Sequence, residues 1–170
     1  IQLDNSVQGA GPLCGRMPGL VTENGFKYLV TRGPKILSAG NSPCGQEASP
    51  MFELLRAVFG HEVNPHFDTQ LFTFMAWLQQ ARMALEQPDR HLPGQMLVLV
   101  GPAGCGKSYL QLLITQMLGG RECDPSLWLQ DKTAFNGNLW EAEHLIMSDS
   151  NLEASGKARN AMRDKIKELV

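Results

Sequence analysis

The stretch that decides the fold reads Gln95-Met96-Leu97-Val98-Leu99-Val100, followed directly by Gly101-Pro102-Ala103-Gly104-Cys105-Gly106-Lys107-Ser108. The first part is a short apolar run, and such runs are typical of strands buried in a parallel sheet. Residues 101–108 fit the pattern G-x-x-x-x-G-K-[ST], and apolar residues at helical spacing follow them. The sequence therefore predicts a strand, a phosphate-binding loop and a helix in succession.

Each residue type in this loop has a chemical reason. Glycines let the backbone turn its N–H groups inward and keep side chains away from phosphate oxygens. Lys107 reaches the β- and γ-phosphates, and Ser108 offers its hydroxyl to Mg²⁺. Cys105 is a small filler in one interpretation, and a thiol activated by the helix end in the other. We predict ATP binding with Mg²⁺ through Gly101, Pro102, Ala103, Gly104, Cys105, Gly106, Lys107, Ser108 and Tyr109.

A second acidic residue is expected at the end of a neighbouring strand, where it holds Mg²⁺ through water. Asp149 fits this role, because it follows the apolar run 144–148. The other interpretation of Asp149 is a helix cap. We expect Lys107 and Asp149 to serve catalysis, and Ser108 and Asp149 to hold the metal.

The remaining chain divides into three parts. Residues 1–48 are rich in Gly, Pro, Asn and Ser and predict loops, with a short strand or hairpin at 25–31. Residues 49–90 predict two helices, the first from Ser49-Pro50 to Gly60 and the second capped by Asp68. Residues 91–170 predict an α/β core of the P-loop NTPase type, a parallel sheet flanked by helices, that is incomplete at the C-terminus.

Several finer expectations complete this outline. The apolar stripe of the second helix is Leu71, Met75, Leu78, Ala81 and Leu85, and the flanking Phe72, Phe74 and Trp77 are core residues or, alternatively, stack on bases. Residues 127–129 predict a second strand, and 155–170 a helix. Its basic residues are a solvated face or, alternatively, a DNA contact: Lys157, Arg159, Arg163, Lys165 and Lys167.

Composition narrows the class of protein. The formal charge is −2, which argues against a protein that coats duplex DNA, and no apolar run is long enough to span a membrane. The four cysteines form no C-x-x-C pair, so we expect free thiols in a reducing cytosol. His61 and His66 are five apart with Pro65 between them, and we expect a loop there instead of a zinc site.

Three segments together resemble a known family: the phosphate loop, the stretch Phe135-Asn136-Gly137-Asn138-Leu139, and the run that ends at Asp149. They look like the superfamily III helicase domain of phage and mobile-element primase-helicases, an AAA+-like ATPase. The C-terminal Ile166-Lys167-Glu168-Leu169-Val170 also matches, and the resemblance covers residues 25–170. It implies a homo-oligomeric ring in the cytoplasm of a bacterial or phage-infected cell, which couples ATP hydrolysis to movement along single-stranded DNA in replication.

Two departures from that pattern qualify the expectation. Ser150 stands where the family has a Glu that polarises the attacking water, and Glu153 lies one turn further on. The family's sensor strand, DNA-contacting element and trans-acting arginine would lie beyond Val170, so we expect slow hydrolysis and a gap in the sheet. The alternatives are a module that senses ATP without turnover, and a P-loop kinase of small molecules, although no Arg-rich lid is visible.

Overall fold

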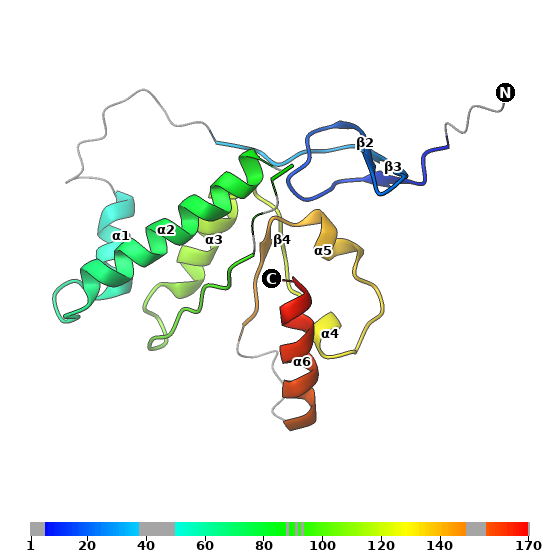
Figure 1. Cartoon of the computed structure of the whole chain (residues 1–170). Helices are drawn as coiled ribbons and strands as arrows, with labels where there is room; N and C mark the ends of the chain where they lie inside the picture. The colour runs from blue at the N-terminus through cyan, green and yellow to red at the C-terminus, as the bar shows by residue number, and fades with distance from the viewer. Residues whose placement is uncertain are drawn as a thin grey trace.

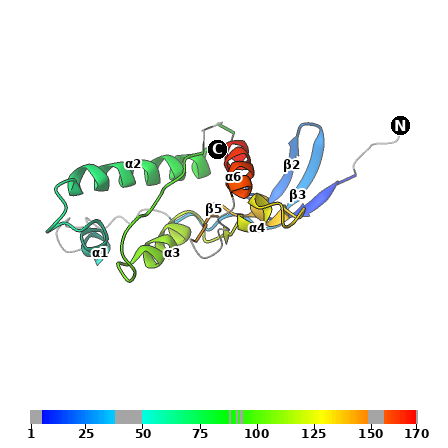
Figure 2. The ribbon, with the colours of Figure 1, turned by 90° about the horizontal axis from the view of Figure 1, so that it is seen from below.

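The computed structural model describes residues 6–37, 50–87, 89–90, 92, 94–148 and 156–169. Figure 1 shows three helices, α1 to α3, at one end of the molecule and a small sheet at the other end. Figure 2 shows the remaining elements between these two ends. In chain order the elements are β1 (Gly9–Gly11), β2 (Gly19–Glu23), β3 (Phe26–Val30), α1 (Pro50–Phe59), α2 (Phe67–Glu86), α3 (Lys107–Met117), β4 (Glu122–Cys123), α4 (Ser126–Leu129), α5 (Gly137–Glu141), β5 (His144–Leu145) and α6 (Gly156–Leu169).

The N-terminal sheet has the order β1-β3-β2. The predicted hairpin is confirmed, since β2 and β3 pair antiparallel around the turn Asn24-Gly25. Both turn residues have positive φ, 49° and 82°, which matches the right-handed twist of a two-residue hairpin. β1 then adds to β3 in parallel. This last pairing gives the N-terminal part more regular structure than its loop-rich composition predicted.

The two helices of the second part are confirmed, and they form the core together with α3. The predicted cap is wrong, because α2 begins at Phe67 with His66 at the N-cap position, and Asp68 lies inside the first turn. The core consists of Leu55, Phe74, Leu85, Leu110, Ile114 and Leu118. Most of the predicted stripe is confirmed, since Leu85 is in the core and Leu71, Leu78 and Ala81 pack against it, but Met75 is 48% exposed. Of the flanking aromatic residues, Phe74 is buried and Phe72 is 75% exposed. Phe74 and the half-buried Trp77 stack at 6.4 Å, which supports their core role.

The predicted strand over 95–100 is wrong, because the described segment 94–100 has no regular structure. A strand exists only when another strand shares its hydrogen bonds, and none of the described strands pairs with this segment. Leu97 and Leu99 pack against the helical core, but Met96, Val98 and Val100 are 56%, 65% and 90% exposed. The segment is therefore covered on one face only, and it is held to α2 by the Trp77 indole, which donates to the Gln95 carbonyl.

The predicted strand at 127–129 is also wrong, since these residues belong to the short helix α4. The Asp124 carboxylate accepts a hydrogen bond from the Ser126 N–H at 2.8 Å, and Pro125 has a φ of −79°. An acidic cap followed by proline starts a helix, and this local signal outweighs the strand preference of the apolar residues. The apolar run 144–148 forms a strand only at its first two residues, in parallel with β4.

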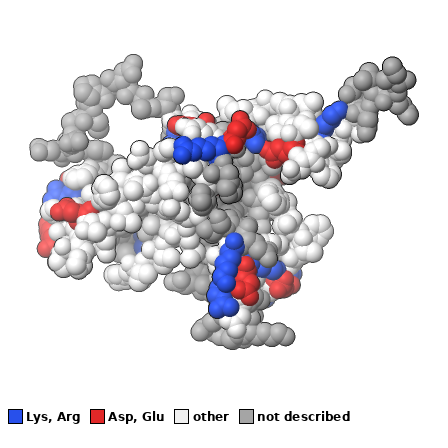
Figure 3. Space-filling model, viewed as in Figure 1, with Lys and Arg blue, Asp and Glu red and all other residues white. Residues whose placement is uncertain are grey.

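The C-terminal helix is confirmed as α6, and it packs on α4 through Lys165. The Lys165 ammonium donates to the Trp128 carbonyl at 2.8 Å, lies 4.8 Å from the centre of the Trp128 ring, and pairs with Asp131. Lys165 therefore has a structural role. Figure 3 shows acidic and basic side chains side by side on α6, which agrees with the pairing of both Arg163 and Lys167 with Asp164. These described residues favour a solvated face over a DNA contact.

Candidate functional site: the loop 101–108

The loop 101–108 has the backbone that its glycines allow. Gly104 and Gly106 have φ values of +78° and +91°, in the left-handed region that favours glycine. Helix α3 begins directly after them, and its first bond runs from the Leu110 N–H to the Gly106 carbonyl at 2.9 Å. The free N–H groups of the first helical turn, and the positive end of the helix, therefore lie at the loop.

Lys107 folds back over the loop. Its ammonium donates to the Gly101 carbonyl at 2.8 Å and to the Pro102 carbonyl at 2.7 Å. The Cys105 sulfur lies 3.5 Å from the same ammonium. The positive charge of Lys107 is thus held over the backbone of the loop by neutral partners, and a more negative ligand would compete well for it.

Helix α1 lies close to the loop at Gly106. A Cβ built on Gly106 would lie 3.2 Å from a methyl group of Val58 and 3.9 Å from Leu54. No described atom lies within 4 Å of a Cβ built on Gly104. Gly106 is therefore required both by its backbone angle and by the approach of α1, whereas Gly104 is required by its angle alone. This contact was not visible in the sequence, because α1 is far from the loop along the chain.

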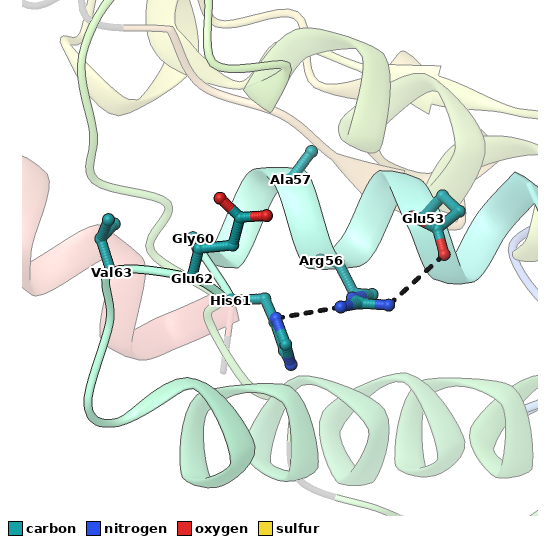
Figure 4. A pocket seen from close by; sticks show the side chains of 7 residues that line it. All are labelled: Glu53, Arg56, Ala57, Gly60, His61, Glu62 and Val63. Atoms are coloured by element: carbon teal, nitrogen blue, oxygen red, sulfur yellow. Dashed lines mark hydrogen bonds and ion pairs between the residues drawn. The ribbon is translucent and has the colours of Figure 1, made fainter. Parts of the chain in front are cut away.

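A shallow hollow of about 430 Å³ opens beside the C-terminal end of α1. Figure 4 shows its lining, which is Glu53, Arg56, Ala57, Gly60, His61, Glu62 and Val63. The Arg56 guanidinium contacts the Glu53 carboxylate at 3.6 Å and the His61 ring at 3.1 Å. His61 also meets Phe67 edge-on, so its position in the loop between α1 and α2 is explained by local contacts, as the sequence predicted.

The other predicted site residues are distributed as follows. Pro102, Ala103, Ser108 and Tyr109 are exposed at the loop, and Cys105 is half-buried within it. A Cβ on Gly101 would lie 3.2 Å from the Cys105 sulfur, so that cysteine fills space against the loop. Asp149, Ser150 and Glu153 lie outside the described residues. Cys14, Cys105 and Cys123 are free thiols, as predicted.

Two polar clusters near α3 were missed by the sequence analysis. The first is the ion pair of Arg121 with Glu143, whose carboxylate side chain is fully buried. The second joins Thr115, Glu122 and His144 around one hydroxyl group. Both depend on pairing between β4 and β5, and strands of two residues leave no periodic signal in a sequence.

Two further properties of the described residues concern metal ligation and membrane segments. The described residues contain no group of three or more His, Cys, Asp or Glu side chains that could hold a metal ion. Within the same part of the chain, no helix has the length and apolar character needed to cross a membrane.

Comparisons of the chain with protein-family models, with curated proteins and with solved structures found no match.

Proposed function

We propose that the chain binds ATP with Mg²⁺ through residues 101–108. The observation that carries the proposal is the loop itself, in which two glycines with positive φ lead into α3 and Lys107 folds back over the loop carbonyls. Backbone N–H groups, a helix N-terminus and one ammonium together favour a polyphosphate. In this proposal Lys107 contacts the β- and γ-phosphates, while Ser108 and Asp149 hold Mg²⁺.

The proposal extends to an ATPase motor domain like that of superfamily III helicases, with a P-loop NTPase core, acting as a ring on single-stranded DNA. Its support is the sequence resemblance, together with the parallel pairing of β4 and β5 next to α3. The alternative, a module that senses ATP without turnover, is supported by Ser150 at the position of the expected glutamate. In this alternative, hydrolysis by the chain is slow and single-stranded DNA does not accelerate it.

The first test is the variant Lys107→Ala. It removes the charge that faces the phosphates but little packing, so we expect loss of ATP binding with the fold intact. The measurement is equilibrium binding of a fluorescent ATP analogue at matched circular dichroism. Lys167→Ala, on the exposed face of α6, is the control and should keep full affinity. Unchanged affinity of Lys107→Ala would refute the proposed site.

A second variant, Asp149→Asn, separates a metal role from a structural one. A carboxylate that acts through Mg²⁺ should lower the affinity for Mg²⁺-ATP more than the affinity for metal-free ATP. Equal losses under both conditions would identify Asp149 as a helix cap. Phosphate release with and without single-stranded DNA then distinguishes the motor from the sensor, because only the motor should be stimulated.

A further inference from the structure

A single hydroxyl group joins α3 to both strands of the parallel pair. The Thr115 Oγ1 lies 2.8 Å from a Glu122 carboxylate oxygen and 2.9 Å from the His144 Nδ1. Glu122 and His144 are paired residues in the β4–β5 register, and the Thr115 hydroxyl contacts both of them. Thr115 is 2% exposed, and its hydroxyl also lies 3.1 Å from the Gln111 carbonyl in the preceding helical turn.

Counting protons fixes the direction of these bonds. A threonine hydroxyl has one hydrogen to donate and two lone pairs to accept with. Glu122 is an exposed residue, and an exposed carboxylate at neutral pH only accepts. The Gln111 carbonyl also only accepts, so the single Thr115 hydrogen is used for Glu122 or Gln111. Only lone pairs of the Thr115 oxygen remain for His144, which must therefore donate its Nδ1–H to Thr115. The neutral ring of His144 then carries its proton on Nδ1.

Helix α3 connects the cluster to the phosphate loop, because Thr115 and Ser108 both lie on it. Thr115 is seven residues after Ser108, two turns along α3, and therefore on the same face as Ser108. Helix α3 begins directly after the loop, and a further stretch of chain follows β5. In the sequence, that chain leads from Leu145 to Asp149.

We propose that Thr115 and His144 are positioning residues, whose hydrogen bond, closed on Glu122, holds the start of β5 against the helix of the phosphate loop. This inference rests on the proposed function, in which Ser108 at the start of α3 and Asp149, four residues after β5 in the sequence, share Mg²⁺. The β4–β5 ladder consists of two residues in each strand, and the bond from His144 to Thr115 connects this short ladder to α3.

Acid should destabilise the fold around the link, although the protonated ring still donates from Nδ1. Burial lowers the pKa of His144 below its ordinary value of 6.5, against an opposing effect of Glu122, the charged group that faces it from β4. A group with a lowered folded-state pKa contributes stability that is complete above its unfolded-state pKa. The contribution of His144 is therefore present above about pH 6.5 and is lost as the pH falls through its folded-state value.

The first experiment examines the link without nucleotide. Long-range ¹⁵N–¹H spectra of the full chain should show the Nδ1–H tautomer for His144. Thr115→Val should speed hydrogen exchange of the Ile146 N–H, which bonds to the Cys123 carbonyl at 2.9 Å. Thr73→Val is the matched control, because Thr73 makes the same bond to a carbonyl one turn back but joins no cluster. An Nε2–H tautomer, or unchanged exchange in Thr115→Val, would overturn the link.

The second experiment measures affinity for ATP with and without Mg²⁺. Thr115→Val should lose at least about fivefold in affinity for Mg²⁺-ATP, within the range of typical coupling between sites, and much less for metal-free ATP. Thr115→Ser keeps the hydroxyl and should retain affinity. His144→Asn keeps a donor near the Nδ1 position, so it should also retain affinity.

The outcomes separate the two proposals. If the unaltered chain does not bind Mg²⁺-ATP, the proposed function and the positioning role both fall, whatever the tautomer of His144. If it binds and Thr115→Val loses affinity equally with and without Mg²⁺, the positioning role alone is refuted.

Discussion

At the scale of single residues, the two glycines in the loop give a matched pair of tests. Alanine at either position meets the cost of a left-handed backbone, about 1–2 kcal/mol. Only at Gly106 does the new Cβ also approach α1, at 3.2 Å from Val58. We therefore expect Gly106→Ala to destabilise the chain more than Gly104→Ala does, by about 1 kcal/mol in urea unfolding.

The contact with α1 can be isolated by a third substitution. Val58→Ala removes the methyl group that the Gly106 Cβ would meet, so Gly106→Ala should cost less in that background. Equal costs in both backgrounds would mean that α1 does not restrict the loop. The positive φ values were predictable from the phosphate-loop pattern, but the α1 contact was not, because it joins residues that no local pattern connects.

At the scale of elements, the segment before the loop was the main error of the sequence analysis. Its apolar run predicted burial on both faces, yet Val98 is 65% exposed while Leu99 packs against the core. An apolar sequence indicates that side chains of a segment will be buried, but a strand also needs a neighbouring strand for its backbone hydrogen bonds. That partner depends on the pairing of distant strands, which composition does not reveal.

This one-sided burial leads to opposite expectations for neighbouring residues. Val98→Thr should change the free energy of unfolding by less than about 0.5 kcal/mol, as for an exposed site. Leu99→Ala should lower it by about 1–3 kcal/mol, because it removes contacts with the helical core. Urea unfolding of both variants is the measurement. A large loss for Val98→Thr would show that the segment is covered on both faces, as in the predicted buried strand.

The helical elements were predicted more reliably, for a physical reason. Helix α1 starts at Pro50 and ends before Gly60, and α3 ends before Gly119 and Gly120, which have φ values of +108° and +84°. Such start and stop signals act within one or two turns of chain, so they are legible in a sequence. The same local chemistry explains α4. Asp124-Pro125 is a helix start signal, whereas the apolar residues 127–129 alone predicted a strand.

At the scale of the whole molecule, Arg121 connects the N-terminal part of the chain to residues that follow α3. Its guanidinium pairs with Glu143 and donates to the Arg32 carbonyl at 2.9 Å and the Leu13 carbonyl at 3.3 Å. The buried Glu143 carboxylate also accepts the Gly15 N–H at 3.2 Å. Arg121 and Glu143 therefore neutralise each other's charge and also form hydrogen bonds with backbone groups of Leu13, Gly15 and Arg32.

Removing one member of this pair should be costly. Arg121→Met leaves a buried carboxylate without its cation, and we expect a loss of about 3–5 kcal/mol in urea unfolding. Arg16→Met is the control, since Arg16 pairs with the exposed Glu23 and Asp89 and should contribute less than about 1 kcal/mol. Similar losses for the two variants would contradict the view that Arg121 joins the two ends of the molecule.

The Glu143 carboxylate also has a consequence for synthesis on the ribosome. It follows Gly15, whose N–H it accepts, by 128 residues, so the N-terminal sheet emerges long before its binding partner exists. At about 5–20 residues per second, the interval is about 6–25 s. The hairpin of β2 and β3 closes within about 1–10 μs and needs no distant residue. The β2–β3 pairing can therefore form before the ribosome has added Glu143, the residue that connects Gly15 to the later part of the chain.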